Sequence, residues 1–229
     1  MKHSNCSQST DYLLAAEPVN LSEWNGLPPK REWISKDWLS IGSVASISGG
    51  DESSSAQKIM TAIATGQWWL GEHFEAAKVY GVFSEHDETE LLHRQHKINK
   101  AFHGRSLDRM KMVSLFGKEN LLMTFDNNNF GVLTHLFYEL LSDIESFEPK
   151  LVVLDTALDL FGGDKENPSH VKQFVQKCCA HIARKVNCAV LLCKHELIET
   201  GAWYDAIKFH MHISLEKSEK SVSKYYTLA

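Results

Sequence analysis

Short apolar runs alternate along the chain with longer segments whose apolar residues recur every three or four positions. Uninterrupted apolar runs are typical of strands buried on both faces of a parallel sheet. We expect strands over residues 44–47, 78–84, 111–116, 151–154, 188–193, 211–215 and 225–228. Helical spacing predicts helices over residues 56–65, 88–102, 132–147 and 169–185. This alternation predicts an α/β fold with a mostly parallel central sheet flanked by helices.

The chain length favours a single folded unit behind a loose lead-in. Residues 1–25 are polar and lack clear periodicity, so we expect a flexible N-terminal segment. Residues 26–229 then form one domain, large enough to bury a sizeable core. The net charge of -5 provides no global attraction to nucleic acid, so such a contact requires a local basic patch.

Targeting signals and cysteine usage both favour a cytoplasmic protein. The first residues lack the apolar run of a signal peptide, and no stretch reaches the ~20 apolar residues of a membrane span. We therefore expect no membrane contact. The 5 cysteines are odd in number and lack CxxC spacing, as in buried thiols of a reducing compartment.

A degenerate phosphate-binding loop follows the first core strand. A functional loop of this kind reads GxxxxGK[ST], in which the lysine reaches the outer phosphates and the hydroxyl ligates magnesium. In the frame that starts at Gly49, Ser54 replaces the second glycine, Ser55 the lysine and Ala56 the hydroxyl residue. The candidate phosphate contacts that remain are Gly49, Gly50, Ser53, Ser54 and Ser55.

Polar residues follow several other predicted strands. Asp155 ends the run 151–154, at the edge where α/β sheets bind ligands, so it either holds magnesium or braces the following loop. His195 follows the run 188–193. Asp155 and His195, with their neighbours, could also form the site of a metal-dependent hydrolase, although nothing in their spacing requires it. His210 and His212 alternate along a predicted strand, and we expect them on a solvated surface.

The most basic stretch of the chain lies between residues 93 and 111. Its cationic side chains are Arg94, Lys97, Lys100, Arg105, Arg109 and Lys111. They could contact nucleic acid, or they could form a solvated helix face and loop. The stretch has few aromatic residues on which bases could stack.

These segments, in order, resemble the RecA-like ATPase domain of RepA-type plasmid and phage replicative helicases, a branch of the P-loop NTPases. The resemblance extends over residues 28–215. Its most specific block is residues 151–156, 159–163 and 171–175, which resemble the family's Walker B strand, loop and next helix. It implies a ring-forming protein that binds ATP and magnesium between subunits and acts on single-stranded DNA.

The departures from this family fall on its catalytic residues. Asp155, the magnesium-site aspartate, is kept, whereas His86 takes the position of the catalytic glutamate. Of the family's double histidine only His195 persists, so His86 and His195 are the remaining candidates for catalysis. We therefore expect a degenerate protein that needs no cofactor and binds DNA, a homologous active subunit or itself. The alternative is an active ATPase with a non-standard loop.

Overall fold

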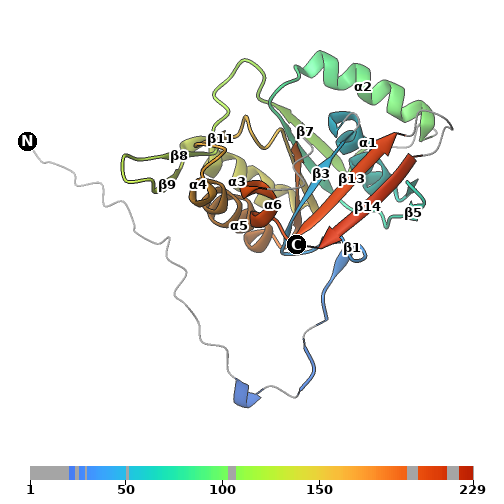
Figure 1. Cartoon of the computed structure of the whole chain (residues 1–229). Helices are drawn as coiled ribbons and strands as arrows, with labels where there is room; N and C mark the ends of the chain where they lie inside the picture. The colour runs from blue at the N-terminus through green and yellow to red at the C-terminus, as the bar shows by residue number, and fades with distance from the viewer. Residues whose placement is uncertain are drawn as a thin grey trace, which may run out of the picture. The chain divides into compact units, whose positions relative to one another are not determined.

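The chain divides into two units, residues 1–30 and 31–229. The computed structural model describes residues 21–23, 26–28, 30–49, 52–102, 107–194, 201–215 and 222–228. In the first unit it shows a short 3-10 helix, η1 (Leu21–Glu23), with all three residues exposed. The second unit contains the sheet, the helices and the core (Figure 1).

A seven-stranded sheet in the order β14-β13-β3-β12-β10-β6-β7 forms the centre of the second unit (Figure 1). Six of its strands are parallel, and β14 pairs antiparallel with β13 at one edge. The strands are β3 (Val44–Ser48), β6 (Val79–Phe83), β7 (Met110–Ser114), β10 (Leu151–Asp155), β12 (Ala189–Lys194), β13 (Phe209–Leu215) and β14 (Val222–Leu228). The predicted α/β fold with a mostly parallel sheet is confirmed.

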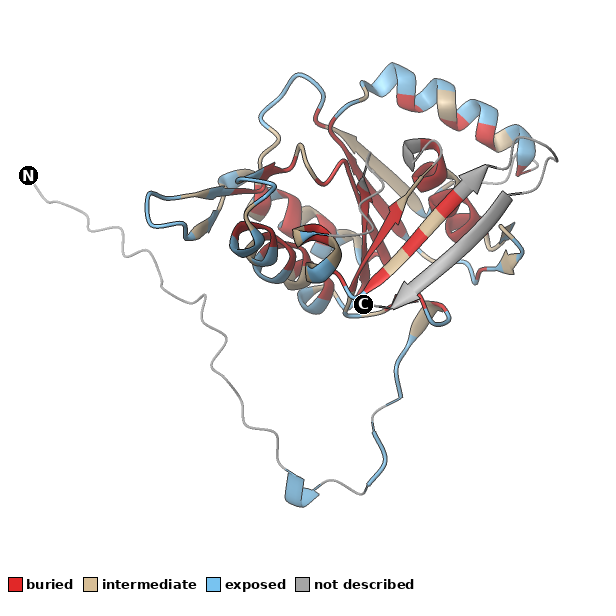
Figure 2. Ribbon diagram, viewed as in Figure 1, coloured by how far each residue is buried: buried red, intermediate tan, exposed pale blue. Residues whose placement is uncertain are grey.

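Helices cover both faces of the sheet, which is why its central strands are apolar throughout (Figures 1 and 2). One face packs against α1 (Glu52–Thr65) and α2 (Glu88–Ala101). The other face packs against α3 (His135–Phe147), α4 (Pro168–Gln173), the π-helix η2 (Phe174–Cys179), α5 (Ala180–Lys185) and α6 (Ala202–Ala206). All five residues of β10 are buried between the two layers.

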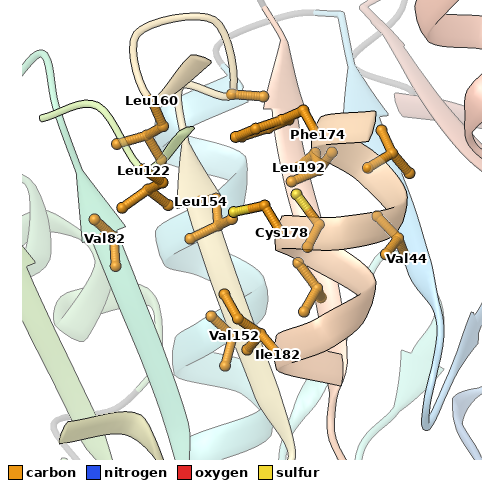
Figure 3. Close-up of a cluster of buried hydrophobic side chains, with 14 of the residues drawn as sticks. Val44, Val82, Leu122, Val152, Leu154, Leu160, Phe174, Cys178, Ile182 and Leu192 are labelled. Carbon is orange, nitrogen blue, oxygen red and sulfur yellow. The ribbon is translucent and has the colours of Figure 1, made fainter. Parts of the chain in front are cut away.

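Alternate residues of each strand supply the two core clusters. Val152 and Leu154 of β10 pack under η2 with Phe174 and Cys178 (Figure 3). Leu151 and Val153 point to the opposite face, with the apolar side of α1. The cysteines Cys178, Cys179, Cys188 and Cys193 are buried thiols, as the sequence predicts, while Cys6 lies outside the described residues.

The segment before α3 differs from the prediction of one helix over residues 132–147. Residues Gly131–Leu133 form β9, because Thr134 begins the helix by accepting a hydrogen bond from the amide of Phe137. Strand β9 pairs with β8 (Met123–Phe125), which in turn pairs with β11 (Phe161–Gly162). None of these three short strands was predicted.

Two of the predicted helices differ from the structure in their bounds or composition. Helix α1 begins at Glu52, one turn before the predicted start, and ends at Thr65. The predicted helix 169–185 consists of α4, η2 and α5 in direct succession, with the π-helix in the middle. Two hairpins complete the fold, β1 (Trp33–Ser35) with β2 (Leu39–Ser40) and β4 (Trp68–Trp69) with β5 (Glu72–His73).

Candidate functional site

The segment predicted to be a degenerate phosphate loop lies at the carboxyl edge of the sheet, between β3 and α1. Gly49 directly follows β3 with a φ of +87°, a conformation that side chains rarely adopt. A Cβ at this position would lie 2.3 Å from the carbonyl oxygen of Ile213 and 2.4 Å from Cε1 of His212. Gly50 lies outside the described residues. The backbone therefore enters the loop pressed against β13, where only glycine fits.

The first turn of α1 contains small, buried side chains where a working loop has its phosphate and magnesium ligands. Ser54 and Ser55 are each 8% exposed, and Ala56 is fully buried. Neither a serine nor an alanine can neutralise phosphate charge, and an alanine cannot ligate a cation. The side chain of Ser53 is not among those described.

Two histidines of β13 form a ladder with two serines of β3, against the prediction of a solvated surface. Strand register sets His210 opposite Ser46 and His212 opposite Ser48. Nδ1 of His210 lies 2.7 Å from the hydroxyl of Ser46, and Nδ1 of His212 lies 3.2 Å from that of Ser48. Both rings are half-buried, and the ring of His210 lies against Tyr204 of α6. These side-chain contacts add to the backbone pairing between β13 and β3, the strand that precedes the phosphate loop.

The tautomer of His210 follows from its partners. Its Nε2 lies 2.8 Å from the carbonyl oxygen of Ile207 and 3.1 Å from that of Tyr204, so Nε2 carries the proton and donates. Nδ1 therefore accepts from the hydroxyl of Ser46. The ring also stacks on Tyr204, with centroids 4.3 Å apart. These contacts make His210 a bridge between α6 and the sheet.

Asp155 is buried at the end of β10, 2% exposed, beside the end of β6. The hydroxyl of Ser84 accepts from the amide of Thr156 at 2.9 Å and donates to Oδ2 of Asp159 at 2.9 Å. The amide of Ser84 donates to the carbonyl oxygen of Asp155 at 2.7 Å. Asp159 was absent from the predicted site. Its place could not be read from the sequence, because a loop and a strand end must meet for this contact to form.

His86, which takes the position of the family's glutamate, is engaged by Arg94. Nη2 of Arg94 lies 3.1 Å from Nε2 of His86, and 3.7 Å from Oε1 of Glu90. A guanidinium can only donate, so Nε2 of His86 is the acceptor. A nitrogen that accepts from a guanidinium is poorly placed to take a proton from water. The arrangement therefore argues against His86 as a general base.

The predicted basic stretch is divided between two faces of the sheet. Arg94 turns inward to His86, with its side chain 15% exposed. Lys111 lies on β7 on the opposite face, where its Nζ is 2.6 Å from Oδ1 of Asp143 on α3. Lys97, Lys100 and Arg109 remain exposed. Arg105 lies outside the described residues, so three of the six predicted cations form an outward-facing group.

The ion pair of Lys111 continues into the core. The hydroxyl of Tyr80 donates to Oδ2 of Asp143 at 2.5 Å. Hydrogen bonds from Lys111 and then from Tyr80 hold the pKa of the Asp143 carboxyl below its usual range. Burial, and next the hydrogen bond to Asp143, raise the pKa of the Tyr80 hydroxyl. Lys111 therefore joins the sheet to α3 and is not a freely solvated cation.

The described residues give no support to a metal-dependent hydrolase site built on Asp155 and His195. His195 lies outside the described residues, so its distance from Asp155 is not defined. Within the ranges given above, no group of three or more His, Cys, Asp or Glu residues is placed to hold a metal ion.

The residues at the loop do not fit a magnesium nucleotide held in the usual way. The lysine position carries a buried serine and the hydroxyl position a buried alanine. Asp155 is kept, yet a single carboxylate binds magnesium weakly without substrate phosphates to complete the shell. What remains for an anion is the backbone and the N-terminus of α1.

Comparisons with known proteins identify a family. None of the curated proteins matches this chain. Apart from these comparisons, no helix of the described part is long and apolar enough to cross a bilayer. The sequence profile of the AAA domain matches residues 10–197, which begins within the predicted N-terminal segment and ends just after β12. The chain belongs to the AAA domain family, P-loop NTPases of the RecA-like superfamily.

Proposed function

We propose that this chain is a pseudo-ATPase related to RepA-type helicases. It acts in DNA replication or in a mobile-element process, by binding single-stranded DNA or a partner subunit without hydrolysing ATP. The observation that carries the proposal is the first turn of α1, where Ser54, Ser55 and Ala56 replace glycine, lysine and hydroxyl residue. The lysine and magnesium together neutralise the charge that develops in phosphoryl transfer, so losing both removes the main source of catalysis.

The position of the water-activating residue supports the same proposal. His86 stands where the related helicases have glutamate, and its Nε2 already accepts from Arg94. Because Nε2 accepts from a guanidinium, this nitrogen is already engaged and is not available to take a proton from water. His86 follows β6 and the phosphate loop follows β3, so the two losses concern separate segments of the chain.

Calorimetric titration of ATP with magnesium tests the loss of nucleotide binding. We expect no heat of binding from the wild-type protein, and no hydrolysis above that of Asp155→Ala. The triple variant Ser54→Gly/Ser55→Lys/Ala56→Ser should recover binding, which would show that the scaffold and the assay are sound. Micromolar binding by the wild-type protein would contradict the proposal.

DNA binding is tested on the cations that face outward. Lys97 and Lys100 lie on the exposed side of α2, and Arg109 precedes β7. Lys97→Glu/Lys100→Glu should weaken binding to a single-stranded oligonucleotide. If each lysine contacts one phosphate, the slope of log K against log salt should fall by roughly 1.4.

Lys172→Glu is the matched control for this test, because Lys172 is an exposed lysine on α4, on the opposite face of the sheet. We expect it to bind DNA as the wild-type protein does. If the double variant keeps wild-type affinity and salt dependence, the face of α2 is a solvated surface and the DNA contact must lie elsewhere.

A second candidate is a nucleotide-binding enzyme with an unusual loop. The retained Asp155 and the 14-residue helix α1 behind the loop favour it, because a helix N-terminus attracts phosphate. This candidate predicts that Asp155→Asn weakens the affinity for ATP and magnesium, measured by the same titration. An unchanged affinity would refute it.

A further inference from the structure

A cavity of about 280 Å³ opens at the amino edge of the sheet, away from the degenerate loop. Three parts of the fold enclose it: the turn from β2 to β3, the junction of η2 with α5, and the connection from α6 to β13. Gly42, Ser43, Ala180, Ala206 and Phe209 are among its lining residues. Because β3 and β13 both run from this edge to the loop, the cavity and the loop lie at opposite ends of the same two strands.

Two cations flank this cavity, and none of its lining residues in the described part of the chain is acidic. The guanidinium of Arg31 lies 5.3 Å from the ring centre of Trp33 and 5.6 Å from that of Phe209. Nζ of Lys208 lies 5.6 Å from the ring centre of Phe209. Aromatic contacts hold both side chains in place but leave their charge uncompensated. Within the described part of the chain, neither cation has a carboxylate within ion-pair distance.

The charge of these two cations contrasts with that of the whole protein. The chain as a whole carries a net charge of -5. A local pair of cations on an acidic protein attracts an anion that the rest of the surface repels.

The inner wall of the cavity is apolar. Its half-buried apolar residues are Ile41, Ala180 and Ala206, while Val44, Val175 and Phe209 lie behind them and are at most 7% exposed. The hydroxyls of Ser40 and Ser43 are 2.7 Å apart, and that of Ser43 donates to the carbonyl oxygen of Ser40. Their hydrogens are therefore used within the turn. What the cavity offers a ligand is an apolar surface below and two cations at the opening.

We propose that this cavity binds a small organic anion, with an apolar body against Ala180 and Ala206 and a phosphate or carboxylate group between Arg31 and Lys208. Ligand pockets commonly have volumes of roughly 300 to 1,000 Å³, so this one suits a molecule of about one ring. A charged head held by two cations and an apolar body out of water are independent sources of affinity. The site requires no nucleotide and does not depend on the state of the phosphate loop.

Phenyl phosphate is the probe for this site, titrated calorimetrically into the full-length protein. We expect saturable one-to-one binding that weakens roughly tenfold in Arg31→Gln and again in Lys208→Gln, the usual effect of losing one charge-assisted contact. Lys118→Gln, an exposed lysine that follows β7 at the opposite edge of the sheet, is the matched control and should bind as the wild-type protein does. Thermal melts of all variants establish that they fold.

Two further probes separate the parts of the proposal. Inorganic phosphate should bind more weakly than phenyl phosphate, and Ala206→Leu should weaken phenyl phosphate by filling the cavity. Benzoate distinguishes a carboxylate head from a phosphate head. No binding of either aromatic anion, or equal affinity of phenyl phosphate for the wild-type protein and Arg31→Gln/Lys208→Gln, would overturn the proposal. Equal affinity for inorganic and phenyl phosphate would overturn the apolar half of it.

Discussion

The imidazole of His212 lies against Gly49, the first residue of the predicted phosphate loop. Strand β13 therefore packs directly on the start of this loop. A Cβ on Gly49 would meet Cε1 of His212 at 2.4 Å and the carbonyl oxygen of Ile213 at 2.3 Å. The first is a side-chain atom that can move, whereas the second belongs to the backbone of β13. The loop is therefore fixed at its first residue by the sheet itself, whatever its later residues bind.

Gly49→Ala should lower the free energy of unfolding by about 3 kcal/mol, from the strained φ together with a backbone collision. Urea denaturation monitored by circular dichroism measures it. Gly71→Ala is the matched control, because Gly71 has a φ of +76° and nothing within 4 Å of the added Cβ. It should lose only about 1 kcal/mol.

Removing the ring should not rescue the variant, because the carbonyl oxygen of Ile213 remains in place. His212→Ala/Gly49→Ala should therefore stay at least as unstable as Gly49→Ala alone. Full recovery in the double variant would show that the ring, and not the strand, restricts this position.

Asp143→Asn should lower stability at pH 7 by about 1 kcal/mol, a small value because the paired side chains are 40% and 41% exposed and water screens them. The folded state lowers the pKa of Asp143, so its contribution is complete above the unfolded value of about 3.9. It is lost as the pH falls through the lower folded value. Urea midpoints at pH 7 and pH 3 measure the change.

Glu145→Gln is the control for Asp143→Asn, since Glu145 forms a looser pair, 3.7 Å from Lys185. It should change stability by less than Asp143→Asn does. A gap between the wild-type protein and Asp143→Asn that widens as the pH falls would contradict the assignment.

His181→Gln should flatten the dependence of stability on pH between about 7 and 5. Burial, and then the charges of Arg184 and Lys185, lower the pKa of His181 in the folded protein. The unfolded chain therefore takes up the proton first, and wild-type stability falls as the pH drops below about 6.5. His135→Gln is the control, because the side chain of His135 is 87% exposed. It should leave the pH dependence unchanged.

Phe161→Ala should lower stability by about 3 to 5 kcal/mol, as truncation of a buried aromatic residue does. Phe161 packs on Phe174 at 5.3 Å and on Trp203 at 5.4 Å between ring centres, and so joins β11 to η2 and α6. Phe130→Ala is the control, at a residue 61% exposed, and should change stability by less than about 0.5 kcal/mol. Thermal melts of both variants compare them.

The sequence predicts the layers of this fold well because burial on both faces leaves an unambiguous signal. The run 151–154 is apolar at every position, and it forms β10, an inner strand whose five residues are all buried. The incorrect predictions concern short segments outside the central sheet. Val132 and Leu133 fit a helical spacing with the residues that follow, and only the cap at Thr134 separates them into a strand. The small sheet of β8, β9 and β11 consists of two- and three-residue strands, too short for any periodicity.

Contacts between distant segments account for the missing parts of the site. The residues of the loop can be aligned from the sequence, since they are consecutive. The pairing of His212 with Ser48 requires the register of β13 on β3, and hydrophobic pattern alone does not define it. Likewise, Arg94 looks like one more cation on a helix until the loop before the helix brings His86 within 3.1 Å.

The position of β3 between β12 and β13 has a consequence for synthesis. Both neighbours of this early strand come from the last quarter of the chain, so a ribosome exposes β3 long before either partner exists. Until then its backbone groups stay unpaired and open to other chains. Chaperone binding to stalled nascent chains should therefore persist until β12 emerges, and should fall once both partners have left the exit tunnel.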